Sequence, residues 1–302
     1  MTIIQLQGDC RDMLKTLPDA SVQSIITSPP YYGLRDYGMP GQIGLEPTPG
    51  EYVQTLVSVF REAFRVLKDT GTLWLNLGDS YASDTKWGGA TSGKHAGKLH
   101  GDTGIGRRRT STGLPDKSLM GIPWRVAFAL QDDGWILRSD IIWHKPNAMP
   151  ESIKDRPTRA HEYVFLFSKQ PRYYYDADAI AEKSSSSGGG FSQKYAEAQL
   201  NHGAMRLARP ETHGKRNKRT VWYIPTRPYA DAHFAVMPEA LVEPCVLAGS
   251  APGDTILDPF GGSGTVGRVA LKHRRAAVLI ELNADYIKLQ DRRTDGVQLV
   301  FE

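Results

Sequence analysis

Apolar positions along the chain follow two spacings, and each spacing predicts a different kind of secondary structure. Short apolar runs of roughly four to eight residues predict buried β-strands, whereas apolar residues spaced three and four apart predict helices. Residues 51–68 show the helical spacing, with Val53, Leu56, Phe60 and Phe64 on one face. Strands are predicted in this way at 3–7, 21–27, 71–79, 136–145, 162–169, 254–260, 276–282 and 297–301. Helices are predicted at 10–18, 51–68, 121–135, 237–250, 265–275 and 283–294. This alternation predicts an α/β fold with a mostly parallel sheet.

The regular alternation weakens between residues 150 and 228, where polar, basic, Gly and Ser residues become frequent. We therefore predict a core formed by 1–149 and 229–302, with 150–228 as an inserted region and a flexible basic loop near 83–118. The overall charge is +4, but segments 84–117 and 183–227 alone carry +4 and +7, which leaves −7 for the rest. Two basic segments on an acidic body are typical of an enzyme that binds a polyanion such as nucleic acid.

Several classes of protein do not fit the composition. The sequence has no apolar run of about 18 residues that could cross a membrane, and it does not begin like a signal peptide. Its two cysteines, Cys10 and Cys245, lie far apart, which indicates a reduced, cytoplasmic protein. None of the eight histidines falls in a zinc-binding pattern, so no metal site is predicted.

The strongest motif is a glycine-rich turn between a predicted strand and a predicted helix. The strand ends near Asp258, Gly261, Gly262 and Gly264 follow, and Glu281 stands at the end of the next predicted strand. Such a turn places backbone N–H groups at the carboxyl end of a strand, and the acidic residue can accept hydrogen bonds from a ribose. The motif predicts a nucleotide-like cofactor, either NAD or S-adenosylmethionine.

Two features favour S-adenosylmethionine over NAD. A dinucleotide fold normally starts with this unit, whereas here most of the predicted strands precede it, so that the sheet would be permuted. An acidic residue directly before the glycines, Asp258, would repel a pyrophosphate but tolerate a sulfonium and an amino group.

A second motif, TSPPYYG at 27–33, follows the predicted strand 21–27. Two adjacent prolines cannot donate hydrogen bonds and stiffen the chain. The motif is either an ordinary turn or a rigid loop that presents carbonyl oxygens, a hydroxyl group and an aromatic ring to a ligand.

DPFGGSGT at 258–265, preceded in the chain by TSPPYYG, resembles the beta group of DNA amino-methyltransferases, which modify cytosine N4 or adenine N6. The resemblance extends from Gly8 to Tyr286 and is weakest at 184–219. It implies a permuted Rossmann-like methyltransferase with a mostly parallel central sheet, in which 150–228 is the target-recognition region. It also implies double-stranded DNA as substrate and S-adenosyl-L-methionine as cofactor. A homodimer and a cognate restriction nuclease are compatible with it as partners.

The resemblance also assigns site residues. The catalytic residues would be Ser28, Pro29, Pro30 and Tyr31. The cofactor-binding residues would be Asp9, Thr27, Asp258, Pro259, Phe260, Gly261, Gly262, Ser263, Gly264 and Glu281. Acceptors on the Ser-Pro loop would hold the hydrogens of the base amino group, and the Tyr31 ring would receive a base that has left the DNA stack. For Asp9, a role as helix N-cap is an equally simple interpretation.

The identity of the base is a finer prediction. Adenine-specific members of the group more often carry Asp or Asn at the position of Ser28, which favours cytosine N4 over adenine N6. An NAD(P)-dependent oxidoreductase and a catalytically inactive DNA-binding relative remain alternatives. Pro244-Cys245 resembles the nucleophile motif of cytosine-C5 methyltransferases, but its apolar helical surroundings favour core packing for Cys245. Trp143, His144 and Lys145 would line the base pocket or contact phosphate, and a half-buried edge strand explains Trp143 equally well.

Overall fold

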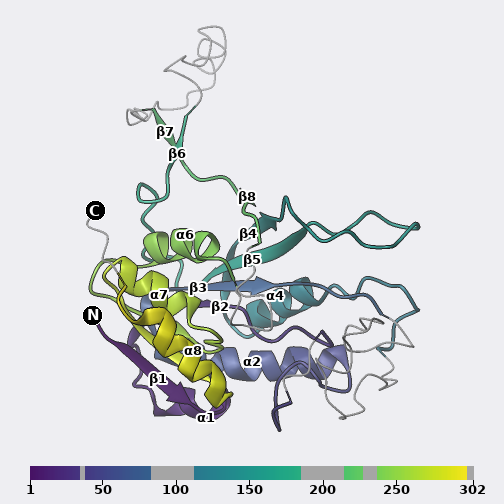
Figure 1. Cartoon of the computed structure of the whole chain (residues 1–302), viewed down its shortest axis with the longest axis horizontal. Helices are drawn as coiled ribbons and strands as arrows, with labels where there is room; N and C mark the ends of the chain where they lie inside the picture. The colour runs from purple at the N-terminus through teal and green to yellow at the C-terminus, as the bar shows by residue number, and fades with distance from the viewer. Residues whose placement is uncertain (35–37, 83–111, 185–213, 227–236, 298–302) are drawn as a thin grey trace, which may run out of the picture.

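The computed structural model describes residues 1–34, 38–82, 112–184, 214–226 and 237–297 (Figure 1). Its strands are β1 (Ile3–Gln7), β2 (Val22–Thr27), β3 (Leu67–Leu77), β4 (Ile136–His144), β5 (His161–Ser168), β6 (Glu182–Lys183), β7 (Lys215–Arg216), β8 (Val221–Tyr223), β9 (Thr255–Asp258) and β10 (Ala276–Glu281). Its helices are α1 (Cys10–Met13), the 3-10 helix η1 (Leu14–Thr16), α2 (Pro49–Val66), α4 (Ile122–Asp132), α6 (Glu239–Gly249), α7 (Thr265–Lys272) and α8 (Ala284–Thr294).

Eight strands form one sheet in the order β1-β10-β9-β2-β3-β5-β4-β8, and β5 is the one strand among them that runs antiparallel to its neighbours. The predicted mostly parallel sheet is therefore confirmed. The first strand, β1, pairs with β10 from Ile3 opposite Ala277 to Gln7 opposite Glu281. Because β2, β9 and β10 are neighbouring parallel strands, their carboxyl ends lie at the same edge of the sheet.

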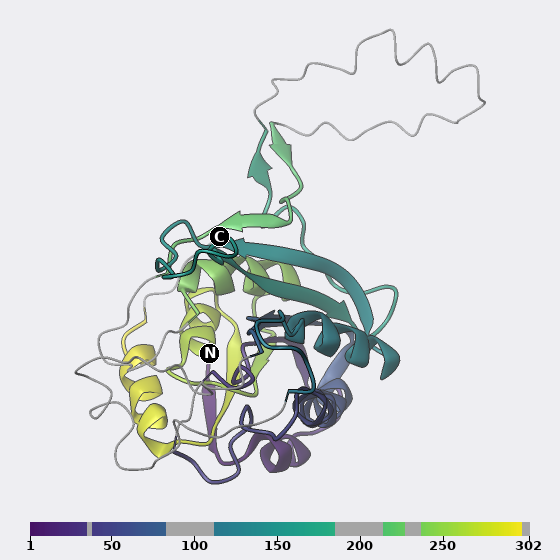
Figure 2. The same cartoon turned by 90° about the vertical axis from the view of Figure 1, so that its right-hand side faces the viewer.

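Helices cover both faces of the sheet (Figures 1 and 2). Successive residues of a strand point to opposite faces, and β3 shows this directly, since Leu73 and Leu75 join the core under α2 and α4 while Trp74 joins the core under α6 and α7. Strand residues form part of both cores. The strand ends that carry the predicted motifs are therefore packed from both faces of the sheet.

Helix boundaries differ from the predicted ones for local reasons. The predicted helix 10–18 is only a short α-helix continued by a 3-10 turn, and it stops before Pro18. In contrast, α2 begins earlier than predicted, because Thr48 and Glu51 form a capping box and Pro49 occupies the first turn. The predicted strand 297–301 lies almost wholly outside the described residues.

The chain from residue 150 onward, predicted as the recognition region, is not structurally separate from the main sheet. Its strand β5 lies between β3 and β4 in the main sheet, and β8 pairs with β4, with Ile142 opposite Val221. Between β5 and β8, the short ribbon of β6 and β7 projects from the molecule (Figure 2). The core therefore includes β5 and β8, because Phe165 and Phe167 of β5 and Trp222 of β8 are buried in it. Most of the predicted basic loop 83–118 lies outside the described residues.

Candidate active site

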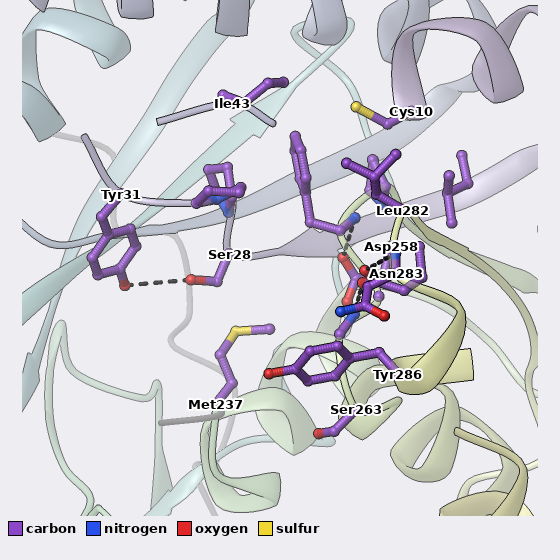
Figure 3. A pocket seen from close by; sticks show the side chains of 18 of the residues that line it. Cys10, Ser28, Tyr31, Ile43, Met237, Asp258, Ser263, Leu282, Asn283 and Tyr286 are labelled. Carbon is purple, nitrogen blue, oxygen red and sulfur yellow. Dashed lines mark hydrogen bonds between the residues drawn. The ribbon is translucent and has the colours of Figure 1, made fainter. Parts of the chain in front are cut away.

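A cavity of about 360 Å³ lies at the carboxyl ends of the parallel strands. This volume is in the range of small-molecule sites, roughly 300–1,000 Å³. Its lining brings together, from both predicted motifs, Asp9, Ser28, Pro29, Pro30, Tyr31, Asp258, Pro259, Phe260, Gly261, Gly262, Ser263 and Glu281. In the close-up, Ser28 and Tyr31 lie on one side of the pocket, and Asp258 and Asn283 lie on the other (Figure 3).

The glycine loop is shaped by close contacts that exclude side chains. A Cβ atom at Gly261 would come within 2.9 Å of Nε2 of Gln290 and 3.1 Å of Cβ of Leu279. Gly262 adopts a φ of +48°, its N–H donates to Oε2 of Glu281 at 2.8 Å, and its carbonyl accepts from Nε2 of Gln290 at 2.9 Å. Helix α8, which carries Gln290, therefore fixes the loop from behind and leaves its other side to the pocket.

Two of the predicted cofactor residues support the pocket without lining it. Thr27 is fully buried, and its hydroxyl donates to Oδ1 of Asp258 at 2.6 Å. Gly264 is the N-cap of α7 with a φ of +82°, and its N–H donates to the carbonyl of Gly261 at 2.8 Å. The Thr27 side chain therefore holds Asp258 in place, and its predicted part in cofactor binding stays a prediction.

Asp258 and Glu281 are two acidic residues that lie near each other and are largely shielded from water. Oδ1 of Asp258 accepts from the N–H of Phe260 at 3.1 Å, and Oε1 of Glu281 accepts from the N–H of Asn283 at 2.8 Å. Burial raises the pKa of Asp258 from 3.8 to about 7, and the nearby Glu281 charge adds to the effect. Burial likewise raises the pKa of Glu281. Within the described residues no cationic side chain pairs with either carboxylate, so the pocket suits a ligand with positive charge and hydroxyl groups.

Asp9 caps α1 and also lines the pocket. Its carboxylate caps α1 by accepting the N–H of Arg11 at 2.9 Å, and it also binds the Arg11 guanidinium. The hydrogen bond from Arg11 lowers the pKa of Asp9. Arg11 in turn donates to the carbonyl of Gly41 at 2.9 Å, so that Asp9 lines the pocket as part of a fixed ion pair.

The Ser-Pro-Pro loop is attached to the helical layer through its second proline. The carbonyl of Pro30 accepts from the hydroxyl of Tyr52 at 2.9 Å, and Tyr52 is fully buried in α2. Tyr32 packs against Tyr52 with ring centroids 5.4 Å apart, so the second tyrosine of the motif belongs to the core. No hydrogen bond to the Pro29 carbonyl is found within the described part of the chain, which leaves this carbonyl available to a ligand.

Tyr31 leads to three site residues that the motifs did not reveal. Its hydroxyl donates to Oε2 of Glu162 at 2.7 Å and lies 3.1 Å from Oδ1 of Asn76, and it accepts from the hydroxyl of Ser28 at 3.3 Å. Glu162 forms an ion pair with Lys145. All of these residues line the cavity. Asn76 and Glu162 lie inside apolar strand runs, where a single polar residue is a weak signal, whereas Lys145 was one of the candidates considered.

Other lining residues come from segments next to the motifs, and Figure 3 labels Cys10, Ile43, Met237, Leu282, Asn283 and Tyr286 among them. Asn283 and Tyr286 lie two and five residues after Glu281 in the chain. Their closeness in sequence to this predicted site residue could have identified them. Trp143 also lines the cavity but is buried, and its Nε1 donates to the carbonyl of Ile224 at 2.8 Å.

Cys245 is buried in α6, where its thiol donates to the carbonyl of Leu241 at 3.3 Å, which confirms its predicted place in the core. In the described ranges no helix is long and apolar enough to cross a membrane. Over the same residues, no group of three or more His, Cys, Asp and Glu side chains is arranged to hold a metal ion.

A mostly parallel sheet with a glycine loop and an acidic strand end around one pocket is a Rossmann-like arrangement, which methyltransferases share with NAD-dependent enzymes. The family model described as DNA methylase, for N6 and N4 methyltransferases, matches residues 22–292. The chain belongs to this family and is therefore a DNA amino-methyltransferase, which removes the oxidoreductase alternative.

Curated relatives agree with this assignment. The type II methyltransferase M.Cfr9I of Citrobacter freundii is 48% identical over 290 residues, which cover 96% of this chain and 87% of the relative. The type II methyltransferase M.SmaI of Serratia marcescens is 48% identical over 286 residues, which cover 95% of this chain and 88% of the relative.

Solved structures share the fold. The PvuII DNA methyltransferase, titled cytosine-N4-specific, superposes with a TM-score of 0.66 at 21% identity over 97% of this chain and 86% of its own. A DNA modification methylase from Thermus thermophilus, solved in complex with S-adenosyl-L-methionine, gives a TM-score of 0.60 at 24% identity, covering 99% of this chain and 97% of its own.

Proposed function

We propose that the protein transfers a methyl group from S-adenosyl-L-methionine to the N4 amino group of a cytosine in double-stranded DNA. The observation that carries the proposal is one cavity in which Ser28 and the Pro29 carbonyl share the lining with Asp258 and Glu281. Serine in place of an acidic residue or Asn at position 28 favours cytosine. The similar fold of a methyltransferase titled cytosine-N4-specific is in keeping with this choice.

The residues present fit the proposed cofactor. Glu281 would accept hydrogen bonds from the ribose hydroxyls, and Asp258 would provide negative charge for the amino and sulfonium groups. These roles suit a buried and a partly buried carboxylate that have no cationic partner in the described residues. The glycine loop would approach the ligand closely because Gly261 and Gly262 carry no Cβ. When bound, S-adenosyl-L-methionine supplies a methyl group activated by the positive charge on sulfur.

The Ser-Pro loop acts on the base. The exocyclic amino nitrogen of cytosine is a poor nucleophile because its lone pair is delocalised into the ring. The hydroxyl oxygen of Ser28 and the carbonyl of Pro29 accept the two amino hydrogens, draw the nitrogen towards a tetrahedral geometry and stabilise the positive charge that develops on it. The prolines and the Tyr52–Pro30 hydrogen bond keep these acceptors in place before the base arrives.

The Tyr31 ring is the proposed stacking surface for the flipped base. It lies against the backbone at Gly78, where a Cβ atom would come within 2.6 Å of the ring. Within region 150–228, the part outside the core strands β5 and β8 is the proposed reader of the target sequence. The type II names of the relatives are consistent with a cognate restriction nuclease, and this nuclease and a homodimer stay predictions.

The test is to express the protein in a host whose DNA carries no methylated cytosine or adenine. Genomic DNA is then digested to nucleosides and measured by mass spectrometry. N4-methylcytosine is expected, and Ser28→Ala serves as the matched control that should reduce it. N6-methyladenine instead would overturn the choice of base, and unmodified DNA would overturn the proposed reaction.

A further inference from the structure

We propose that Glu162 on β5 is a positioning residue that sets the direction of the hydrogen bonds at Ser28, so that the serine hydroxyl accepts from the base. This inference rests on the proposed function and adds to it a residue outside both sequence motifs.

The hydrogen bonds form a chain from the pocket to Glu162. The hydroxyl of Tyr31 has a single hydrogen, and it lies 2.7 Å from Oε2 of Glu162 and 3.1 Å from Oδ1 of Asn76. The shorter distance and the negative charge favour Glu162 as the acceptor. The oxygen of Tyr31 then accepts from the hydroxyl of Ser28 at 3.3 Å.

The surroundings of Glu162 make this direction the stable one. Lys145 pairs with its carboxylate, with side-chain exposures of 19% for Lys145 and 14% for Glu162. Nδ2 of Asn76 donates to the same Oε2 at 3.1 Å and to the carbonyl of Tyr163 at 3.0 Å. An ionised carboxylate only accepts hydrogen bonds, so every neighbour must donate to it. Burial and the Glu162 charge raise the pKa of Tyr31, which keeps its hydroxyl protonated and able to donate.

This chain of hydrogen bonds matters because the hydroxyl of Ser28 can either donate or accept. If its hydrogen pointed into the pocket, it would oppose the N–H groups of the base. With that hydrogen directed to Tyr31, the Ser28 oxygen presents lone pairs to the amino group as it becomes tetrahedral. The antiparallel strand β5 makes this possible, since it places Glu162 opposite Trp143 at the pocket end of β4.

The test is a double-mutant cycle on single-turnover methyl transfer, with DNA and S-adenosyl-L-methionine affinities measured separately. Glu162→Gln can donate from its amide and removes the charge, so we expect a rate about 10- to 100-fold lower than wild type with both affinities unchanged. In the Ser28→Ala background, Glu162→Gln should cause no further loss, because the oriented group is already absent.

Tyr31→Phe removes the hydroxyl that links Ser28 to Glu162 and leaves the carboxylate unchanged. It should show the same lack of additivity with Ser28→Ala. It replaces Glu162→Gln in the cycle if that variant does not fold. Tyr32→Phe is the matched control, because Tyr32 lies in the core, and it should keep the wild-type rate. Equal losses from Glu162→Gln in both backgrounds, or a Glu162→Gln enzyme at the wild-type rate, would overturn the proposal. If nucleoside analysis identifies adenine as the target, the base assignment fails, while the same cycle on adenine still tests Glu162.

Discussion

Replacing Asp258 by Asn tests whether the buried carboxylate of Asp258 lacks a positively charged partner in the pocket. Asn keeps the shape of the side chain and an oxygen that can accept from Thr27 and from the N–H of Phe260, but it does not ionise. The variant therefore separates the charge of Asp258 from its structural hydrogen bonds.

The magnitude follows from the pKa of Asp258, which burial raises from 3.8 to about 7. Between these two values the folded protein keeps a proton that the unfolded chain releases, so this group stabilises the fold fully below about pH 4, and the contribution is lost as the pH rises through 7. With about 1.36 kcal/mol for each tenfold step, the contribution falls by about 3 kcal/mol between pH 5 and pH 8.

The measurement is denaturant-induced unfolding of wild type and Asp258→Asn at several pH values from 5 to 8, without ligand. All other titrating groups are common to both proteins, so the difference between the two curves isolates Asp258. Relative to Asp258→Asn, the wild type should lose about 3 kcal/mol over this range. S-adenosyl-L-methionine affinity of the wild type should fall below pH 7, because binding then requires release of the proton. A constant difference between wild type and variant at every pH would refute this reasoning.

Three further predictions concern separate parts of the site. Glu281→Ala should weaken S-adenosyl-L-methionine binding by about 1.5–3 kcal/mol, which calorimetry on the folded variant measures, because charge-assisted hydrogen bonds are lost. Ser28→Ala should lower the methylation rate about 10²-fold with nearly unchanged ligand affinities, whereas Ser28→Asp should retain activity because it keeps an acceptor; a wild-type rate for Ser28→Ala would contradict this role. Replacing Lys215 and Lys218 by Ala should weaken binding to all DNA sequences and reduce the salt slope of log K by roughly 0.9 per phosphate contact, whereas an unchanged slope would mark both as solvated residues.

The sequence predicted those parts of the site in which function lies in consecutive residues. The glycine loop takes its shape from neighbouring positions, so a nucleotide-like ligand could be predicted from its spacing, whereas the spacing alone did not distinguish NAD from S-adenosylmethionine. The same holds for the strands, whose apolar runs are local. Glu162 could not be found in this way, because it meets Tyr31 only through the pairing of β5 with β3 and β4. Thr27 was placed correctly at a strand end, but whether it faces the ligand or Asp258 depends on packing between two strands.

The pairing of β1 with β10 has a consequence for synthesis on the ribosome. Strands β2 to β5 emerge in succession and are close to one another in the sheet, whereas β1 must wait for β10, whose last residue is Glu281. Pairing across such a long sequence distance forms slowly. The glycine loop, which also emerges late, completes the pocket only when β9 and β10 have joined β1 and β2. A nascent chain that carries the complete Ser-Pro-Pro loop therefore still lacks half of its pocket, and no shortened product of translation that ends before β9 can modify DNA.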